Sequence, residues 1–192
     1  MLNKLLMGLA ALVVGVALGA GSLWYMLFRA SPTPVISVGI WRMNPLAGSA
    51  ANDPYSRLRI AITSILALNK SETIYFEALA DNEGAPLSAA CDYTLIGQPP
   101  EARWWSVTAY GPDDMLIQSQ SRRYSASAAT VSALSTGEVQ IALTPDGSGP
   151  NGIATGNGTF ALLLRLYQPS EGLAAAPDSA PLFRLVKGAC RA

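Results

Sequence analysis

Two neighbouring arginines, Arg122 and Arg123, followed by Tyr124, are of residue types well suited to ligand binding. A guanidinium group is planar and can hold a carboxylate or a phosphate through two parallel hydrogen bonds. The same side chains can instead bond strand-end carbonyl groups or neighbouring acids. Both interpretations fit the sequence, and we favour the structural one.

A pair of tryptophans, Trp104 and Trp105, lies in a run whose alternation predicts a strand over Arg103–Tyr110. Successive side chains on a strand point to opposite faces. Trp105 therefore shares an apolar face that should lie in the core, whereas Trp104 and Tyr110 share a mixed face. The mixed face could serve as an aromatic platform for a sugar or a planar group. It could equally be covered by a helix predicted from Asp53 to Asn69, and buried aromatic residues are the commoner case.

The usual catalytic arrangements are missing from the sequence. Without histidine there is no Ser-His-Asp or Cys-His arrangement and no imidazole base. The glycine-rich segment Pro145–Gly158 is predicted to be one long loop, and it lacks the lysine of a phosphate-binding loop. Asp113 and Asp114 follow Gly-Pro in a turn. We therefore predict no catalytic residues, no metal site and no cofactor. A hydrolase built on two carboxylates is the remaining enzymatic alternative, and it needs two acids that face one cleft.

Charge and hydropathy place the chain at a membrane rather than on a nucleic acid. Leu5–Phe28 holds 24 positions without a charge, and a helix of that length spans about 36 Å, more than the hydrocarbon core of a bilayer. Trp24 and Tyr25 lie near one end, where aromatic rings prefer the interface. Removing Lys4 and Arg29 from the 13 basic residues leaves 11 against 13 acidic ones. The remainder therefore carries no basic surface for nucleic acid.

The apolar span is predicted to be an uncleaved anchor, over residues 1–29, that crosses the inner membrane once. The competing interpretation is a cleaved signal peptide, since Ala17–Ala20 offers small residues, but the bulky apolar residues that follow argue against it. Three small residues in the span, Ala11, Gly15 and Gly19, are four apart, and this spacing lets two helices approach closely. Because such residues are common in membrane helices, a specific helix contact is only one of two interpretations.

After a linker predicted over residues 30–51, a domain is predicted over residues 52–192. Short alternating runs in it are separated by turns rich in glycine and proline. This pattern predicts a mainly β domain, a β-sandwich or jelly roll. The predicted strands are Thr73–Ala80, Cys91–Ile96, Arg103–Tyr110, Met115–Gln118, Glu138–Leu143, Thr159–Tyr167 and Leu182–Lys187.

One amphipathic helix is predicted at the start of the domain, ending near Asn69. Asp53 is a suitable N-cap, and Pro54 is a suitable first helical residue. Apolar residues recur at spacings of three and four, which gives the helix one apolar face. This face consists of Tyr55, Leu58, Ile62 and Ile65.

Five segments together resemble the DUF1214 domain, a bacterial domain of unknown function that is often found with DUF1254. In chain order they read DPYSRLRIAITS, LADNEGAPLSAACDYTLIG, ARWWSVTAYGPDDMLI, RRYS and GTFALLLRLYQP. The resemblance covers about Asn52 to Arg191. It implies a jelly-roll-like β domain and supplies no catalytic residues. Short membrane-anchored versions are similar to proteins encoded beside an anchored DUF1254 protein, so the resemblance also implies a DUF1254 partner.

The sequence departs from the family pattern at Asn151–Ala154, which reads NGIA where family members often carry an N-W-L-P-like stretch. The aromatic residue is missing, so a pocket beside it would be altered or absent. Cys91 and Cys190, by themselves, could form one disulfide or be two separate buried thiols. Both match the family pattern, in Cys91–Tyr93 and Gly188–Arg191, and the resemblance therefore implies a disulfide.

A disulfide persists only in an oxidising compartment, so we expect the domain on the periplasmic side of the inner membrane. The leading functional hypothesis is a membrane-anchored, non-enzymatic interaction module that pairs with a DUF1254 protein. The alternative is a domain that binds a small ligand or glycan through Trp104, Tyr110 and the arginine pair with Tyr124. A carboxylate-based hydrolase is the least favoured.

Overall fold

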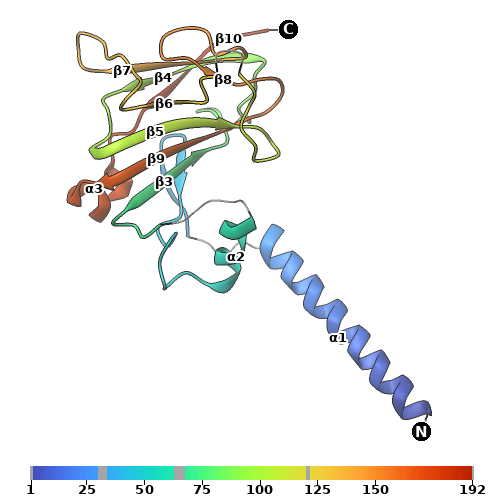
Figure 1. Ribbon diagram of the computed structural model, residues 1–192. Helices are drawn as coiled ribbons and strands as arrows, with labels where there is room; N and C mark the ends of the chain where they lie inside the picture. Colours follow the sequence, from blue (N-terminus) through green and yellow to red (C-terminus); the bar gives the residue numbers. More distant parts are fainter. Residues whose placement is uncertain (1, 30–33, 63–67, 120–121, 192) are drawn as a thin grey trace.

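A long apolar helix, α1 (Leu2–Phe28), projects away from a domain built of two β-sheets (Figure 1). The computed structural model describes residues 2–29, 34–62, 68–119 and 122–191. Within α1 only Leu27 is buried, and the helix is long and apolar enough to cross a membrane. The predicted apolar helix is therefore confirmed, and its role as an anchor stays a prediction. Residues 30–33 of the predicted linker lie outside the described residues.

The larger sheet has six strands in the order β1-β2-β3-β9-β5-β6, and all neighbouring strands are antiparallel. β9 lies near its centre, paired with β3 on one side and with β5 on the other. The strands are β1 (Ile36–Val38), β2 (Trp41–Met43), β3 (Thr73–Ala78), β5 (Ala102–Tyr110), β6 (Ser125–Ser127) and β9 (Ala161–Pro169).

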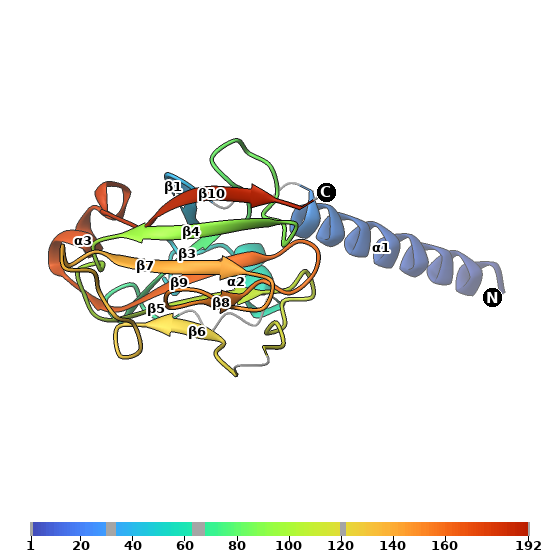
Figure 2. The ribbon, with the colours of Figure 1, turned by 90° about the horizontal axis from the view of Figure 1, so that it is seen from above.

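The smaller sheet has four strands in the order β10-β4-β7-β8. Only the β7–β8 pair is parallel. Figure 2 shows β10, β4 and β7 side by side across the domain. The strands are β4 (Cys91–Gly97), β7 (Val139–Thr144), β8 (Ile153–Ala154) and β10 (Arg184–Cys190).

The two sheets share one buried hydrophobic cluster, as in a β-sandwich. From the larger sheet Phe76, Val107 and Leu164 are 0% exposed, and from the smaller sheet Leu95 and Ile141 are 0% exposed. Full burial of one such side chain stabilises a fold by about 1.5–3 kcal/mol. The prediction of a mainly β, sandwich-like domain is confirmed, and the finer description as a jelly roll stays a prediction.

Six of the predicted strands correspond to β3, β4, β5, β7, β9 and β10, with small shifts at their ends. The strand predicted over Met115–Gln118 is wrong. That segment makes one isolated bridge, from Leu116 to Tyr110, and Met115 is exposed. The physical reason is that β6 occupies the pairing positions beside β5.

Two segments predicted to lack regular structure contain short strands. Pro145–Gly158 was expected to be one loop, but β8 lies within it and pairs with β7. The predicted linker over residues 30–51 contains β1 and β2, which form a hairpin at the edge of the larger sheet. Trp41 in this hairpin is 1% exposed, and its indole N–H donates to the Phe183 carbonyl oxygen at 2.7 Å. This part of the linker therefore belongs to the sandwich core.

Helix α2 (Pro54–Ile62) begins as predicted. One carboxylate oxygen of Asp53 accepts hydrogen bonds from the backbone N–H groups of Tyr55 and Ser56, at 2.9 and 3.0 Å. Residues 63–67, where the last part of the predicted helix falls, lie outside the described residues, and Leu68 and Asn69 are not helical. The Asn69 carbonyl accepts from the backbone of Glu72 in a turn that leads into β3. Between β9 and β10 lie a short helix α3 (Glu171–Ala175) and a 3-10 turn η1 (Pro177–Ser179).

Candidate functional site

The tryptophan side chains of β5 point to opposite faces of the larger sheet, as the alternation predicts. Trp105 and Val107 are 3% and 0% exposed and lie in the core, whereas Trp104 is 37% exposed on the outer face of the larger sheet. Trp104 and Tyr110 lie near opposite ends of β5. Six residues at about 3.3 Å each separate them by about 20 Å, so the structure does not bring them together as one aromatic platform.

Trp104 instead forms a groove with residues of the neighbouring strands. The register places Trp104 beside Tyr167 of β9, and their rings meet edge to face with centroids 5.3 Å apart. The open groove beside them has a volume of about 590 Å³. Its described lining consists of Leu68, Glu72, Thr73, Arg103, Trp104, Tyr167 and Gln168.

The polar groups of this groove, which we call the Trp104 groove, are few and fixed. The Arg103 guanidinium donates to the side-chain oxygen of Gln168 at 2.9 Å. Gln168 has a φ of 47°, a left-handed conformation that is uncommon for residues other than glycine, and its backbone N–H donates to the Glu72 carbonyl at 2.8 Å. Thr73 is 2% exposed, and its hydroxyl is a buried polar group without a hydrogen-bond partner among the described residues. Such groups are rare in folded proteins, and this one borders the groove.

Two carboxylates do not meet in the Trp104 groove. Of its described lining residues, only Glu72 is an acid. A hydrolase of the two-carboxylate type needs an acid and a second carboxylate that flank the scissile bond. The groove can hold a ligand by aromatic contact and hydrogen bonds, but it does not supply that pair.

The other end of β5 is held by Arg165 of β9. Its guanidinium donates to the Thr108 hydroxyl at 3.1 Å and to the Tyr110 hydroxyl, and it stacks over the Tyr110 ring at 5.6 Å from the centroid. Tyr110 therefore has a structural partner within the domain.

Glu77 lies on the same outer face, directly opposite Arg42 of β2. Partial desolvation on the sheet raises the pKa of its carboxyl group, and the nearby Asp114 carboxylate acts in the same direction. The guanidinium groups of Arg42 and Arg59 oppose this shift. Arg59 belongs to α2, so one side of that helix faces the sheet.

The segment Arg122–Tyr124 lies directly before β6, away from the Trp104 groove. Ser125 is opposite Thr108 in the register, so the segment leads into β6 on the Tyr110 side of β5. Arg122 has a φ of 54°, and its backbone N–H closes a turn to the Ser119 carbonyl at 3.0 Å. Arg122 and Arg123 are both exposed. The five residues predicted to bind a ligand are therefore divided between two places on the sheet.

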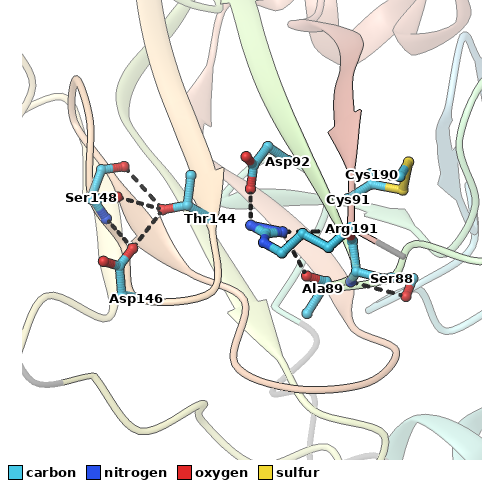
Figure 3. A network of polar contacts seen from close by, with 10 residues as sticks. Ser88, Ala89, Cys91, Asp92, Thr144, Asp146, Ser148, Cys190 and Arg191 are labelled. Atoms are coloured by element: carbon cyan, nitrogen blue, oxygen red, sulfur yellow. Dashed lines mark hydrogen bonds and ion pairs between the residues drawn. A yellow bond between two sulfur atoms is a disulfide. The ribbon is translucent and has the colours of Figure 1, made fainter.

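Cys91 and Cys190 form a disulfide, the pairing that the resemblance implied, and it joins β4 to β10 (Figure 3). Arg191 lies beside it, pairs with the Asp92 carboxylate and donates to the Ala89 carbonyl at 3.3 Å. A separate cluster nearby joins the carboxylate of Asp146 to Thr144 and Ser148 (Figure 3). The backbone N–H of Ser148 is the main cause that lowers the pKa of Asp146. The disulfide and the contacts of Arg191 hold the chain end against the smaller sheet.

A second tie to β10 comes from the turn after β3. The Lys187 ammonium donates to Asp81 at 2.8 Å and to Glu83 at 3.1 Å. The Asp81 side chain is 2% exposed, and it also accepts from the backbone N–H groups of Glu83 and Ala85, each at 3.0 Å. The hydrogen bond from Lys187 lowers the pKa of Asp81, and the same contact raises the pKa of Lys187.

Comparison with known families decides what this domain is. A family model described as "Protein of unknown function (DUF1214)" matches residues 72–171, more than half of the 192-residue chain. The chain belongs to the DUF1214 family. The match includes the three strands that line the Trp104 groove, β3, β5 and β9.

One solved structure shows a similar fold within a longer chain. The VPA0106 protein from Vibrio parahaemolyticus is 22% identical with a TM-score of 0.58, over 69% of this chain and 35% of that one. An uncharacterized protein from Burkholderia cenocepacia is 14% identical with a TM-score of 0.42, over 86% of this chain and 38% of that one. The chain thus spans little more than a third of the length of either structure. No curated protein matches the chain.

Several residues of the DUF1214 domain were missed from sequence. Tyr167 and Thr73 join Trp104 in the groove only through the pairing of β3, β9 and β5, which no local pattern reveals.

The small residues Gly15 and Gly19 of α1 have nothing within 4 Å of an added Cβ. A helix contact through them and Ala11 stays a prediction. Among the described residues there is no group of three or more His, Cys, Asp or Glu side chains placed to hold a metal ion.

Proposed function

We propose that this DUF1214 protein is a membrane-anchored, non-enzymatic binding module whose β domain stands on the periplasmic side of the inner membrane. The observation that carries the proposal is α1, an apolar helix in which, among the described residues, Leu27 alone is buried. The exposed apolar surface of a helix as long as α1 is unfavourable in water and favourable in lipid. The Cys91–Cys190 disulfide supports an oxidising compartment.

The partner that we propose is a DUF1254 protein in the same membrane. Its support is the family resemblance, since short anchored DUF1214 proteins are similar to proteins encoded beside an anchored DUF1254 protein. The fold also occupies about a third of a longer chain in VPA0106, so there it has further polypeptide beside it.

Co-purification from native membranes tests this pairing. The full-length chain carries a C-terminal tag, is expressed at its natural level and is extracted in mild detergent. The proposal predicts that a DUF1254 protein is recovered with it in near-stoichiometric amount. Recovery of no DUF1254 protein, although its gene is present and expressed, would contradict the pairing.

A matched variant identifies which part of the chain makes the contact. Leu164 is 0% exposed at the centre of the core, and Leu164→Asp would unfold the β domain while leaving α1 intact. If the β domain holds the partner, this variant remains in the membrane fraction and loses the DUF1254 protein. Retention of the partner would instead assign the contact to α1.

A second candidate function is the binding of a small ligand in the Trp104 groove. The specific observation is the buried Thr73 hydroxyl, which has no partner among the described residues and borders a groove with an aromatic pair. Aromatic rings stack on the apolar faces of sugars and planar groups, and a hydroxyl orients them. The class predicted is a neutral or weakly charged sugar or planar compound.

Tryptophan fluorescence tests this second function, with a panel of monosaccharides, disaccharides and aromatic carboxylates as probes. Binding should change the emission of the natural chain and of Tyr110→Phe, because Tyr110 lies outside the groove. It should disappear in Trp104→Ala and weaken in Thr73→Val. Equal binding by the natural chain and Trp104→Ala would refute the groove as the site.

A further inference from the structure

Helix α2 exposes its apolar side to the surroundings. Tyr55, Leu58 and Ile62 are 36%, 39% and 55% exposed, whereas the buried residue of the helix is Ser56. Positions three and four apart lie on one side of a helix, so these three residues form a single stripe. A helix on a water-soluble domain normally buries such a stripe against the core. The stripe of α2 is therefore exposed, although its apolar composition is typical of a buried helix face.

The opposite side of α2 faces the domain. Ser56 is 3% exposed, and Ile60, four residues further on and on the same side of the helix, is half-buried. The helix start is fixed by Asp53, which caps the first backbone N–H groups. The side of the helix that carries Ser56 and Ile60 is therefore turned to the domain, and the apolar stripe is directed away from it.

The last turns of α1 lie beside α2. The two helices contact each other, and Leu27, near the end of α1, is buried. Figure 1 shows α2 between the sheet and the end of α1 that meets the domain. Here α1 carries exposed aromatic residues, with Trp24 54% and Phe28 62% exposed, and the Arg29 guanidinium lies 5.9 Å from the centre of the Trp24 ring. Aromatic and arginine side chains at a helix end are typical of the membrane interface.

We propose that α2 lies in the interface of the bilayer leaflet from which α1 emerges, with Tyr55, Leu58 and Ile62 inserted among the lipid headgroups and upper acyl chains. This inference rests on the membrane anchoring proposed above. Because α1 holds α2 at the depth of Trp24 and Phe28, lipid is the apolar phase within reach of the stripe. Interfacial helices bury their apolar side about 5–10 Å into this boundary. α2 itself contains no acidic residue that would be repelled by an anionic leaflet.

The consequence is that the β domain has two attachments to the membrane. α1 alone would hold the domain at one place, which leaves tilting and rotation of the domain unrestricted. Contact through α2 restricts that motion and fixes which face of the larger sheet is turned to the bilayer. A partner anchored in the same membrane would then meet a domain of defined orientation.

Depth-dependent quenching in the full-length chain tests the inference. A single cysteine is introduced at Ile62 and labelled with an environment-sensitive fluorophore without reductant, which leaves the Cys91–Cys190 bridge closed. The protein is reconstituted into vesicles of phosphatidylethanolamine and phosphatidylglycerol that contain lipids with a quencher near the headgroup. Two control positions are labelled in the same way. Phe28 marks the end of the anchor, and Leu134, 43% exposed, belongs to the connection between β6 and β7. This connection lies at the far side of the domain from α1 (Figures 1 and 2).

The proposal predicts a blue-shifted emission and strong lipid quenching at Ile62, comparable to those at Phe28, with neither effect at Leu134. Quenching at Phe28 without quenching at Ile62 would overturn the inference while leaving the anchor intact. Protection of Ile62 from an aqueous quencher without lipid quenching would also overturn it, in favour of a protein partner or a second copy. Absence of lipid quenching at both Ile62 and Phe28 would refute the anchoring itself.

Discussion

Removal of the Cys91–Cys190 bridge should be strongly destabilising, and the length of the loop that it closes gives the expected loss in the free energy of unfolding. The two cysteines are 99 positions apart, so the bond closes a loop of 100 residues counted inclusively. In the chain-entropy model, a loop of that length contributes about 4.7 kcal/mol to the free energy of unfolding at 25 °C. Small domains have only about 5–15 kcal/mol in total. Replacement of both cysteines by serine should therefore remove a large share of the stability.

The variant should nevertheless remain folded, because β10 has other contacts. Its backbone pairs with β4, Leu185 is 4% exposed in the core, and Lys187 is tied to the buried Asp81. We expect a cooperative transition with a lower midpoint and faster proteolysis at the C-terminus. Loss of the β10 pairing in the native state is not expected.

Urea unfolding of the full-length protein in detergent micelles, followed by tryptophan fluorescence, measures the change. The natural chain treated with reductant gives the same state by a second route. Arg191→Ala is the matched control, because it removes a neighbouring ion pair whose side chains are 48% and 42% exposed. Exposed pairs contribute about 0–1 kcal/mol. A double-serine variant that loses no more stability than Arg191→Ala would refute the loop-closure reasoning.

Three further predictions concern the sandwich itself. Leu164→Ala, at a side chain that is 0% exposed, should lower the free energy of unfolding by about 2–5 kcal/mol in urea titrations. Trp105→Ala should lower the free energy of unfolding by about 3–5 kcal/mol, because this ring is 3% exposed. Trp104→Ala should lower it distinctly less, because that ring is 37% exposed. Equal losses would contradict the assignment of the two faces of β5. The pKa of Asp81 is lowered in the folded state, so its stabilising effect is complete above the unfolded pKa, near 4, and is lost as pH falls through the folded value. Thermal melts from pH 6 to pH 2 should therefore show a weaker acid dependence for Asp81→Asn than for the natural chain.

The parts of the fold that follow from local rules could be predicted from sequence. Alternation over Arg103–Tyr110 assigned Trp105 to the core, and Asp53 and Pro54 marked the start of α2. Strands of two or three residues, such as β6 and β8, are too short for a periodic signal and form only because longer strands offer them partners.

The candidate site could be predicted only in part, because it depends on strand register. Trp104 was identified from its type and face, but Tyr167 reaches it through a pairing between β5 and β9. Tyr110 shares the face of Trp104 in the sequence and is distant from it along the strand. For α2, the spacing of Tyr55, Leu58 and Ile62 revealed an apolar face but not what covers it. The covering depends on where the neighbouring elements lie, and the structure leaves that face exposed.

The most direct test of the central claim, an anchored domain on the periplasmic side, is an alkaline phosphatase fusion after Ala192 in a bacterial host. The enzyme is active only where its own disulfides form, so its activity reports the compartment of the C-terminus. The account predicts full phosphatase activity in the membrane fraction that resists extraction with high salt and is released by detergent. An inactive fusion, together with a fluorescent-protein fusion at the same position that glows in the cytoplasm, would contradict the orientation. Phosphatase activity in the soluble periplasmic fraction would contradict the anchor.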